Sequence, residues 1–328
     1  MWRILILYVL LNVSTVDGFS QAIDNLSSFR MFDAKSYFRF NYDNDYFTAT
    51  DYYYTQGINF EVVAPAYGKF FLARTLYTGK QGNSQYGIAV EHNAYTPTNI
   101  SSDQILYGDR PFAAALMFRT FSMTDRAATR DRITSSLTLG IIGPAAGGYE
   151  MQREIHARIH ATTPMGWQYE IANDIVINYE IGYERNVGMV RDIFLVNMLG
   201  TLHAGTLSSK ATVGAVLMFG RLNSTILSAF DGKGTPFNPT KKLRFHAYAQ
   251  PLINLVGYDA TLQGGWFNHS SSYTIAAEDI SRITGQINYG VVVSFNSMYL
   301  EYYKAAITKE WESGMTHRWG GIRVGVKL

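Results

Sequence analysis

The sequence predicts an all-β fold: a transmembrane antiparallel β-barrel of about 12 strands with a short helix in an extracellular loop. Three observations support this prediction. Long runs alternate between apolar and polar side chains, as expected for strands with one face toward lipid and the other toward water. The aromatic content is 14%, with 23 Tyr and 5 Trp, and barrels use such residues at both membrane boundaries. There is no cysteine, so disulfides cannot stabilise an exported chain.

Residues 1–18 are predicted to be a secretory signal peptide. They carry one charge, Arg3, then an apolar run, with Val16 and Gly18 at the positions that a signal peptidase recognises. This stretch is too short for a spanning helix. Residues 19–328 contain no Pro- or Ser-rich linker and no charge run, so we expect them to form a single outer-membrane β-barrel domain. The net charge of +2 gives no reason to expect nucleic acid as a partner.

Period-two alternation defines the strands in order. In the first, Phe38 and Phe40 lie on one face, while Arg39 and Asn41 lie on the other. An even number of strands suits a single-chain bacterial barrel. A soluble β-sandwich is the alternative, but its strands are usually only about 5–6 residues long. The twelve expected strands are 36–47, 52–64, 85–95, 111–124, 131–143, 168–186, 189–205, 208–222, 241–256, 279–295, 297–309 and 315–328.

The segment between the fifth and sixth strands carries a predicted helix over residues 147–160. Side chains four residues apart lie above one another on a helix. The spacing therefore places a polar column beside an apolar column, which could pack on acyl chains or on the barrel wall. The polar column is Gln152, His156 and His160, and the apolar column is Met151, Ile155 and Ile159.

His156 is the candidate catalytic residue of this helix, although a lone loop histidine can also be an exposed polar residue. A zinc site with His160 is a weak hypothesis, because the Glu of an HExxH motif and a third ligand are missing. No serine occupies a Gly-x-Ser-x-Gly elbow. If the protein hydrolyses an ester, a water activated by His156 is therefore the better nucleophile.

The first hairpin, Asn41 to Thr55, offers several oxygen ligands. Carboxylate, amide and hydroxyl oxygens suit Ca²⁺, although the same residues could form a solvated acidic loop tip. Alternation predicts that Asp45 and Thr55 point inward together with Asp43 and Asp51, whereas Asn44 points outward unless a bulge turns it. A further segment, Gly108 to Phe112, is either a turn with Pro entering a strand or a loop that aims Arg110 at a phosphate.

Together these segments resemble the outer-membrane lipid A deacylase family, the calcium-dependent barrels that remove the 3′-linked acyloxyacyl chain of lipid A. The resemblance spans the mature chain and rests on the order and spacing of several motifs. They are Asn44-Asp45, Asp51 with Tyr54 to Gly57, Gly108 to Phe112, Gly140 to Pro144 with Gly147-Gly148, Gln152 and His156, Gly166-Trp167, and Ala260 to Gly264.

The resemblance implies that His156 is the general base and Gln152 its neighbour, with Asn44, Asp45 and Thr55 as active-site and calcium-side residues. It also implies a Ca²⁺ cofactor, lipid A as substrate, and a site that faces the outer leaflet of the outer membrane. Where characterised members have Glu six residues after the histidine, this chain has Thr162. Weaker metal binding, a substitute carboxylate such as Glu150 or Asp51, or loss of activity would each follow.

Other functions stay open at this point. The Thr162 departure admits a non-catalytic barrel, either a channel or an inactive family member, although a lumen packed by residues such as Arg39 and Glu61 should pass little current. An outer-membrane phospholipase differs only in its substrate. Two helix arginines either meet lipid A phosphates or pair along the helix, Arg153 with Glu150 and Arg158 with Glu154. We expect a monomer that contacts outer-membrane lipids.

Overall fold

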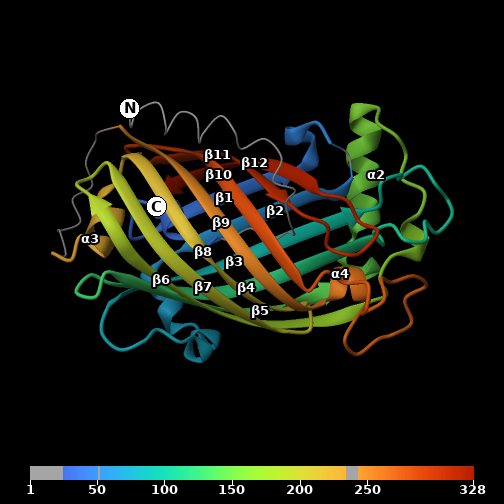
Figure 1. Ribbon diagram of the computed structural model, residues 1–328, viewed down its shortest axis with the longest axis horizontal. Helices are drawn as coiled ribbons and strands as arrows, with labels where there is room; N and C mark the ends of the chain where they lie inside the picture. The colour runs from blue at the N-terminus through green and yellow to red at the C-terminus, as the bar shows by residue number, and fades with distance from the viewer. Residues whose placement is uncertain (1–24, 51, 234–242) are drawn as a thin grey trace.

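The computed structural model describes residues 25–50, 52–233 and 243–328. The predicted signal peptide and Asp51 lie outside this part. Twelve antiparallel strands form a closed barrel in which each strand pairs with its sequence neighbours and β1 pairs with β12 (Figure 1). The strands are β1 Tyr37–Asn44, β2 Tyr53–Val63, β3 Asn83–Thr96, β4 Ala113–Arg126, β5 Asp131–Ile142, β6 Asp174–Val190, β7 Phe194–Gly205, β8 Ser208–Arg221, β9 Arg244–Asp259, β10 Ile283–Phe295, β11 Met298–Ile307 and β12 His317–Lys327.

The predicted fold class and all twelve predicted strands are confirmed, with boundaries that shift by a few residues. The largest difference is at β6, which begins at Asp174 instead of residue 168. A short 3-10 helix, η6 (Trp167–Tyr169), precedes it. The ring of Trp167 packs against Phe112, with centroids 5.0 Å apart. Residues 167–169 are therefore part of a packed loop before the chain enters the sheet.

The helices lie at the two ends of the barrel. None of those in the described residues is long and apolar enough to cross a bilayer. We call the two ends the α2 end, which also carries α4, and the α3 end, where the chain terminates (Figure 1). The helices are α2 Gly148–Ile159, α3 Ser224–Phe230 and α4 Ala260–Gln263, with 3-10 helices η1 Ser28–Arg30, η2 Asp45–Thr48, η3 Pro65–Lys69, η4 Phe71–Thr75, η5 Pro144–Ala146 and η6.

The two faces of the wall differ as the alternation predicts. Inside, Arg39 Nη2 lies 2.5 Å from Glu61 Oε1, and Arg30 Nε lies 3.0 Å from Glu301 Oε1, with all four side chains buried. Outward positions such as Val291 carry exposed apolar side chains. A polar, salt-bridged lumen inside an apolar outer band is the arrangement of an outer-membrane barrel.

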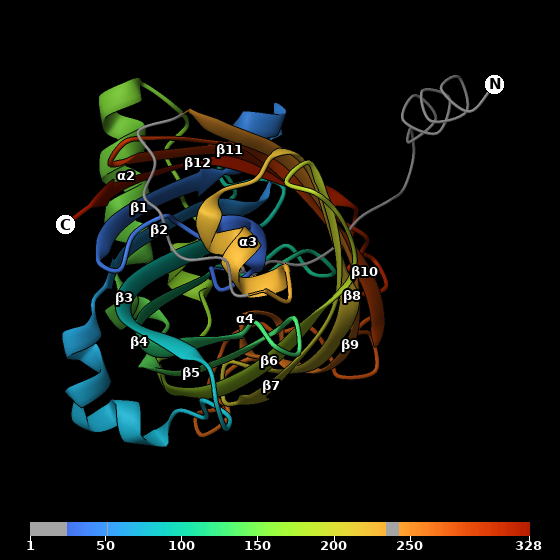
Figure 2. The same cartoon turned by 90° about the vertical axis from the view of Figure 1, so that its left-hand side faces the viewer.

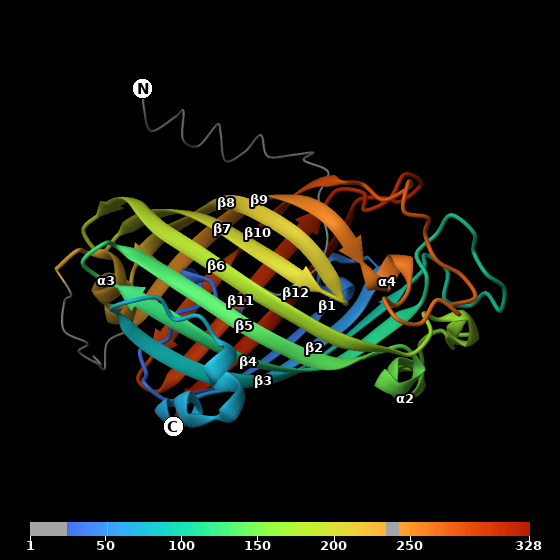
Figure 3. The same ribbon diagram turned by 90° about the horizontal axis from the view of Figure 1, so that it is seen from below.

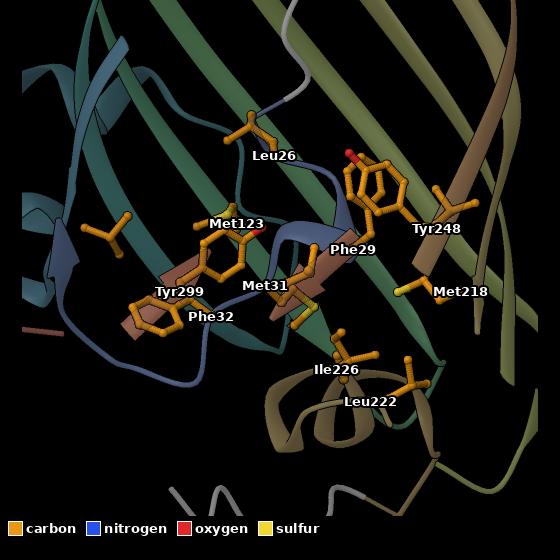
Figure 4. Close-up of a cluster of buried hydrophobic side chains, with 14 of the residues drawn as sticks. Leu26, Phe29, Met31, Phe32, Met123, Met218, Leu222, Ile226, Tyr248 and Tyr299 are labelled. Carbon is orange, nitrogen blue, oxygen red and sulfur yellow. The ribbon is translucent and has the colours of Figure 1, made fainter. Parts of the chain in front are cut away.

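Residues 25–34 form a plug inside the α3 end (Figure 4). Phe29 stacks on Tyr248 of β9, with ring centroids 3.8 Å apart, and Phe32 contacts Tyr299 of β11. Helix α3 closes the same end and belongs to the same apolar cluster through Ile226. The plug has no period-two pattern and was not predicted from the sequence. It fills the lumen where a channel would need an opening.

The Arg39–Glu61 pair gives a test of how the lumen is stabilised. Removing only the cation leaves a buried carboxylate, which costs about 3–5 kcal/mol, whereas replacing both charges by apolar groups is often neutral. We therefore expect Arg39→Met to lower the urea midpoint of the refolded barrel strongly, and Arg39→Met with Glu61→Leu to recover most of it. Equal destabilisation by the single and double variants would show that the ion pair is not the relevant interaction.

Candidate active site

Helix α2 lies outside the barrel wall at the α2 end (Figure 2). It follows Gly147, which has φ +76°, and its first residue packs tightly on the wall. A Cβ at Gly148 would lie 2.5 Å from the Cβ of Ala114 and 2.6 Å from the ring of Trp167. Only glycine allows this approach. The apolar cluster around this contact also includes Ala146 and Phe112, so the start of α2 is fixed against β4.

Gln152 links α2 to both the loop behind it and the barrel. Its side chain is buried. The indole Nε1 of Trp167 donates to Gln152 Oε1 at 2.7 Å, and Gln152 Nε2 donates to Thr55 Oγ1 at 3.1 Å. Two of the residues predicted for the site, Gln152 and Thr55, are therefore in direct contact, and Trp167 orients the amide between them.

A β-bulge turns Thr55 toward the helix. The pairing of β2 with β3 shifts register between Tyr54 and Gln56, which leaves Thr55 as the extra residue. The prediction that Thr55 points into the lumen was therefore wrong. The next residue, Gln56, places its amide against the sulfur of Met151 on α2. The candidate site accordingly lies outside the wall, between α2 and β2.

Asn44 and Asp45 form the end of the first hairpin beside Thr55. The Asn44 amide nitrogen donates to the main-chain carbonyl of Thr55, and its Oδ1 accepts from the Tyr46 amide at 2.7 Å, which caps η2. Asp45 is buried at the start of η2, and its Oδ2 accepts from the Tyr52 amide at 2.5 Å. An unbroken chain of contacts thus joins Asn44, Thr55 and Gln152.

His156 lies one turn after Gln152 on α2. Its Nδ1 is 2.5 Å from the main-chain oxygen of Thr162. A carbonyl oxygen can only accept, so Nδ1 carries the hydrogen and the neutral ring has its lone pair on Nε2. The backbone of Thr162 therefore orients the imidazole, at the position where the family resemblance leads one to expect a Glu side chain.

The two predicted columns of the helix are only partly confirmed. The helix ends at Ile159, and His160 is its C-cap in the left-handed region, with φ 55°. His160 therefore leaves the polar column, and the predicted end of the helix at residue 160 was one residue late. In the apolar column Met151 contacts the wall, whereas Ile159 is 65% exposed.

The arginines that could have bound phosphate make protein contacts. Arg110 lies 2.6 Å from Glu310 and donates to Thr261 at 2.7 Å, so it ties strand ends together at the α2 end. On α2, Arg158 pairs with Glu154 at 3.6 Å, as the i, i+4 spacing predicts. Arg153 instead lies over the ring of Tyr149, 5.2 Å from its centroid.

The oxygen donors of the hairpin fit a hard divalent cation in type. Asp45 supplies a carboxylate, Asn44 an amide oxygen and Thr55 a hydroxyl, which is the chemistry that Ca²⁺ prefers. Within the described ranges, no three His, Asp or Glu side chains come together as metal ligands. The single carboxylate at this point implies that main-chain oxygens, water or substrate would complete the coordination.

Glu170 is a buried carboxyl that the sequence did not single out, because it falls in the predicted sixth strand. Its Oε2 has no hydrogen-bond partner among the residues described. Burial, together with the nearby carboxylate of Glu150, raises the pKa of Glu170 to about 8. Glu150, proposed above as a substitute carboxylate, is exposed in the first turn of α2.

Two of the comparisons with known proteins give matches. The profile of a family described as "Outer membrane protein LpxR" matches residues 5–328. Comparison with curated proteins finds no match. LpxR from Salmonella typhimurium superposes with a TM-score of 0.74 at 18% identity, over 89% of this chain and 100% of that chain. The β domain of the Bordetella autotransporter BrkA gives a TM-score of 0.45 at 8% identity, over 90% of this chain and 100% of that chain.

The family match covers nearly the whole chain, and the superposition on LpxR shows the same barrel fold. The motif order in the sequence pointed to the same family. The chain therefore belongs to the family of the outer membrane protein LpxR, the lipid A 3′-O-deacylases of the bacterial outer membrane.

Proposed function

We propose that this protein hydrolyses the ester that links the 3′ acyloxyacyl chain to lipid A, with His156 as the general base. The observation that carries the proposal is the contact from His156 Nδ1 to the Thr162 carbonyl, which leaves Nε2 free to accept a proton. His156 takes a proton from water as the water oxygen attacks the ester carbonyl. The imidazolium then returns a proton to the departing sugar oxygen, so that a fatty acid and a free hydroxyl result.

The position of the site suits a lipid substrate. It lies on the outside of the barrel wall, where acyl chains contact the protein, and not in the polar lumen. Ile159 and Met165, near the end of α2, are 65% and 48% exposed. Such apolar side chains can pack on acyl chains while the ester reaches the imidazole. In this proposal the α2 end, with its longer loops, faces the outer leaflet.

We propose Ca²⁺ as the cofactor, held by Asp45, Asn44 and Thr55. When bound, a divalent cation polarises the ester carbonyl and stabilises negative charge that develops on its oxygen. Gln152 supports the metal side by fixing the Thr55 hydroxyl, and Trp167 in turn fixes Gln152. In this proposal, α2 supplies the imidazole that acts as base, and the first hairpin supplies the oxygen ligands for the cation.

A channel is the alternative that the fold argues against. The plug of residues 25–34 and α3 fill the α3 end, and buried ion pairs lie inside the barrel, between Arg39 and Glu61 on adjacent strands and between Arg30 of the plug and Glu301 of β11. An inactive family member and a phospholipase differ from the proposal in chemistry and substrate, and mass spectrometry of lipids from cells with and without the gene distinguishes both.

His156→Ala should lower the rate of 3′ acyl release by about 10²–10⁴-fold, the usual contribution of a general base. The measurement is the mass of lipid A after incubation with purified protein. His160→Ala is the matched control, since His160 is an exposed histidine beyond the end of the same helix. Comparable loss in both variants, or full activity in His156→Ala, would refute the role given to His156.

Chelation of Ca²⁺ with EGTA should abolish acyl release, and adding Ca²⁺ back should restore it. Asp45→Asn removes the only carboxylate among the three proposed ligands, so it should raise the Ca²⁺ concentration needed for half-maximal activity by at least about tenfold. The readout is lipid A mass across a Ca²⁺ titration. Activity that is indifferent to EGTA would exclude the proposed cofactor.

Glu170 predicts a pH dependence of stability. The pKa of Glu170 in the folded protein, about 8, lies above the ordinary value of 4.5. The contribution of the protonated carboxyl to the free energy of unfolding is therefore fully present below pH 4.5 and is lost as the pH rises through 8. Glu170→Gln keeps the neutral form at every pH. The variant should melt several degrees above the wild type at pH 9 and at the same temperature at pH 4. A higher melting temperature of the wild type at pH 9 would contradict this.

A further inference from the structure

The connection from β2 to β3 lies outside the barrel at the α3 end, and we call residues 65–82 the wall segment (Figures 2 and 3). It contains η3 and η4. Phe70 packs on Phe118 of β4, with centroids 6.2 Å apart. The Tyr77 amide donates to the hydroxyl of Tyr179 on β6, at 3.1 Å, and that hydroxyl donates to the Thr75 carbonyl at 3.0 Å. The wall segment is thus fixed across the outer faces of three strands, β4 to β6.

The wall beneath this segment is polar, unlike the rest of the outer band. Beneath the wall segment, the outward positions of β4 and β5 carry hydroxyl residues that are almost completely buried. Three of these hydroxyls form hydrogen bonds with one another, with Ser84 of β3 or with the wall segment. Ser122 and Ser135 lie 3.0 Å apart, and Ser135 also donates to the Tyr77 carbonyl at 2.9 Å, while Thr124 lies 2.8 Å from Ser84. Lipid offers such hydroxyls no partner. The wall segment therefore takes the place of lipid against this patch. The buried hydroxyl residues are Thr120, Ser122, Thr124 and Ser135.

The opposite surface of the wall segment combines aromatic rings with positive charge. Phe71 is 67% exposed and Tyr77 is 53% exposed. Lys69, Arg74 and Lys80 are all exposed. No Asp or Glu occurs between residues 61 and 91, and none of the ion pairs within the described residues uses these three cations.

We infer that the wall segment binds anionic glycerophospholipid headgroups in the leaflet at the α3 end of the barrel. Aromatic side chains favour the boundary between headgroups and acyl chains, and lysine and arginine beside an anionic leaflet are attracted to its phosphates. Charge complementarity identifies the ligand, because a surface with three exposed cations and no acidic residue attracts a negatively charged lipid. The leaflet on the periplasmic side consists of glycerophospholipids, and with the α2 end outward, the wall segment lies on that side. The orientation is shared with the proposed function, but lipid binding is measured without catalysis.

The test compares two triple variants of the full-length protein in detergent. Lys69→Gln/Arg74→Gln/Lys80→Gln neutralises the wall segment. Arg191→Gln/Arg221→Gln/Lys327→Gln is the matched control, since it removes three exposed cations from the same end of the barrel. Native mass spectrometry counts the molecules of phosphatidylglycerol, or of zwitterionic phosphatidylcholine, that each protein retains. Far-UV circular dichroism and a melting curve establish that each variant is folded.

The wild type should retain phosphatidylglycerol in preference to phosphatidylcholine. The wall-segment variant should lose at least about tenfold of its phosphatidylglycerol affinity, as expected when three cations near a surface are removed, and the control should lose less than twofold. In the wild type, 0.5 M ammonium acetate should remove the preference by screening the charges, which tests the inference even if the variant fails to fold. The inference would be overturned if the wild type retained both lipids equally, or if both variants lost affinity equally. It would also be overturned if the wild type and the control were dimers and the wall-segment variant a monomer, because the wall segment would then bind a second copy of the chain.

Discussion

The pairing of β1 with β12 is the constraint on which the rest of the structure depends. A strand edge left open in a bilayer would expose main-chain N–H and C=O groups that lipid cannot satisfy. The two strands pair from Tyr37 with Lys327 to Asn44 with Gly320. Glycines on β12 make this pairing compatible with a filled lumen: a Cβ at Gly321 would lie 2.7 Å from the Cβ of Asp43. The glycines of β12 thus pair with β1 to close the barrel and also leave room for the polar side chains of β1 inside it.

Closure also fixes the hairpin that carries the oxygen donors. The hydroxyls of Thr48 and Thr50 donate to the carbonyl of Arg318 at the start of β12, at 2.9 and 3.2 Å. On its other side the hairpin meets β3 and, through the bulge at Thr55, helix α2. The candidate site therefore combines a hairpin fixed by the seam of the barrel with a helix fixed by glycine contacts on its outer wall. Gln152 on this helix donates to Thr55 at the end of the hairpin, so the two elements are joined by a direct hydrogen bond.

The strands could be predicted from the sequence because lipid and lumen impose opposite demands on alternate residues, and that demand is local. The order of motifs also assigned Gln152 and Thr55 to one site, and in the structure these two side chains are in contact. The bulge at Thr55 could not be predicted, since an extra residue in a ladder has no side-chain signature. The plug was missed because its contacts are remote in sequence: Arg30 and Glu301 are 271 residues apart. Glu170 was hidden in a run of residues that resembles a strand.

In this chain the contact between His156 and the main chain at position 162 makes the orientation of the imidazole independent of the side chain at that position. A side-chain acceptor is lost by one point mutation, whereas a peptide carbonyl is supplied by every amino acid. The turn from residue 156 to residue 162 can therefore drift in composition while the ring keeps its orientation. Its length is a different matter, because one inserted or deleted residue would rotate the carbonyl away. If His156 acts as the proposed base, the length of this turn therefore matters more than the side chain at position 162.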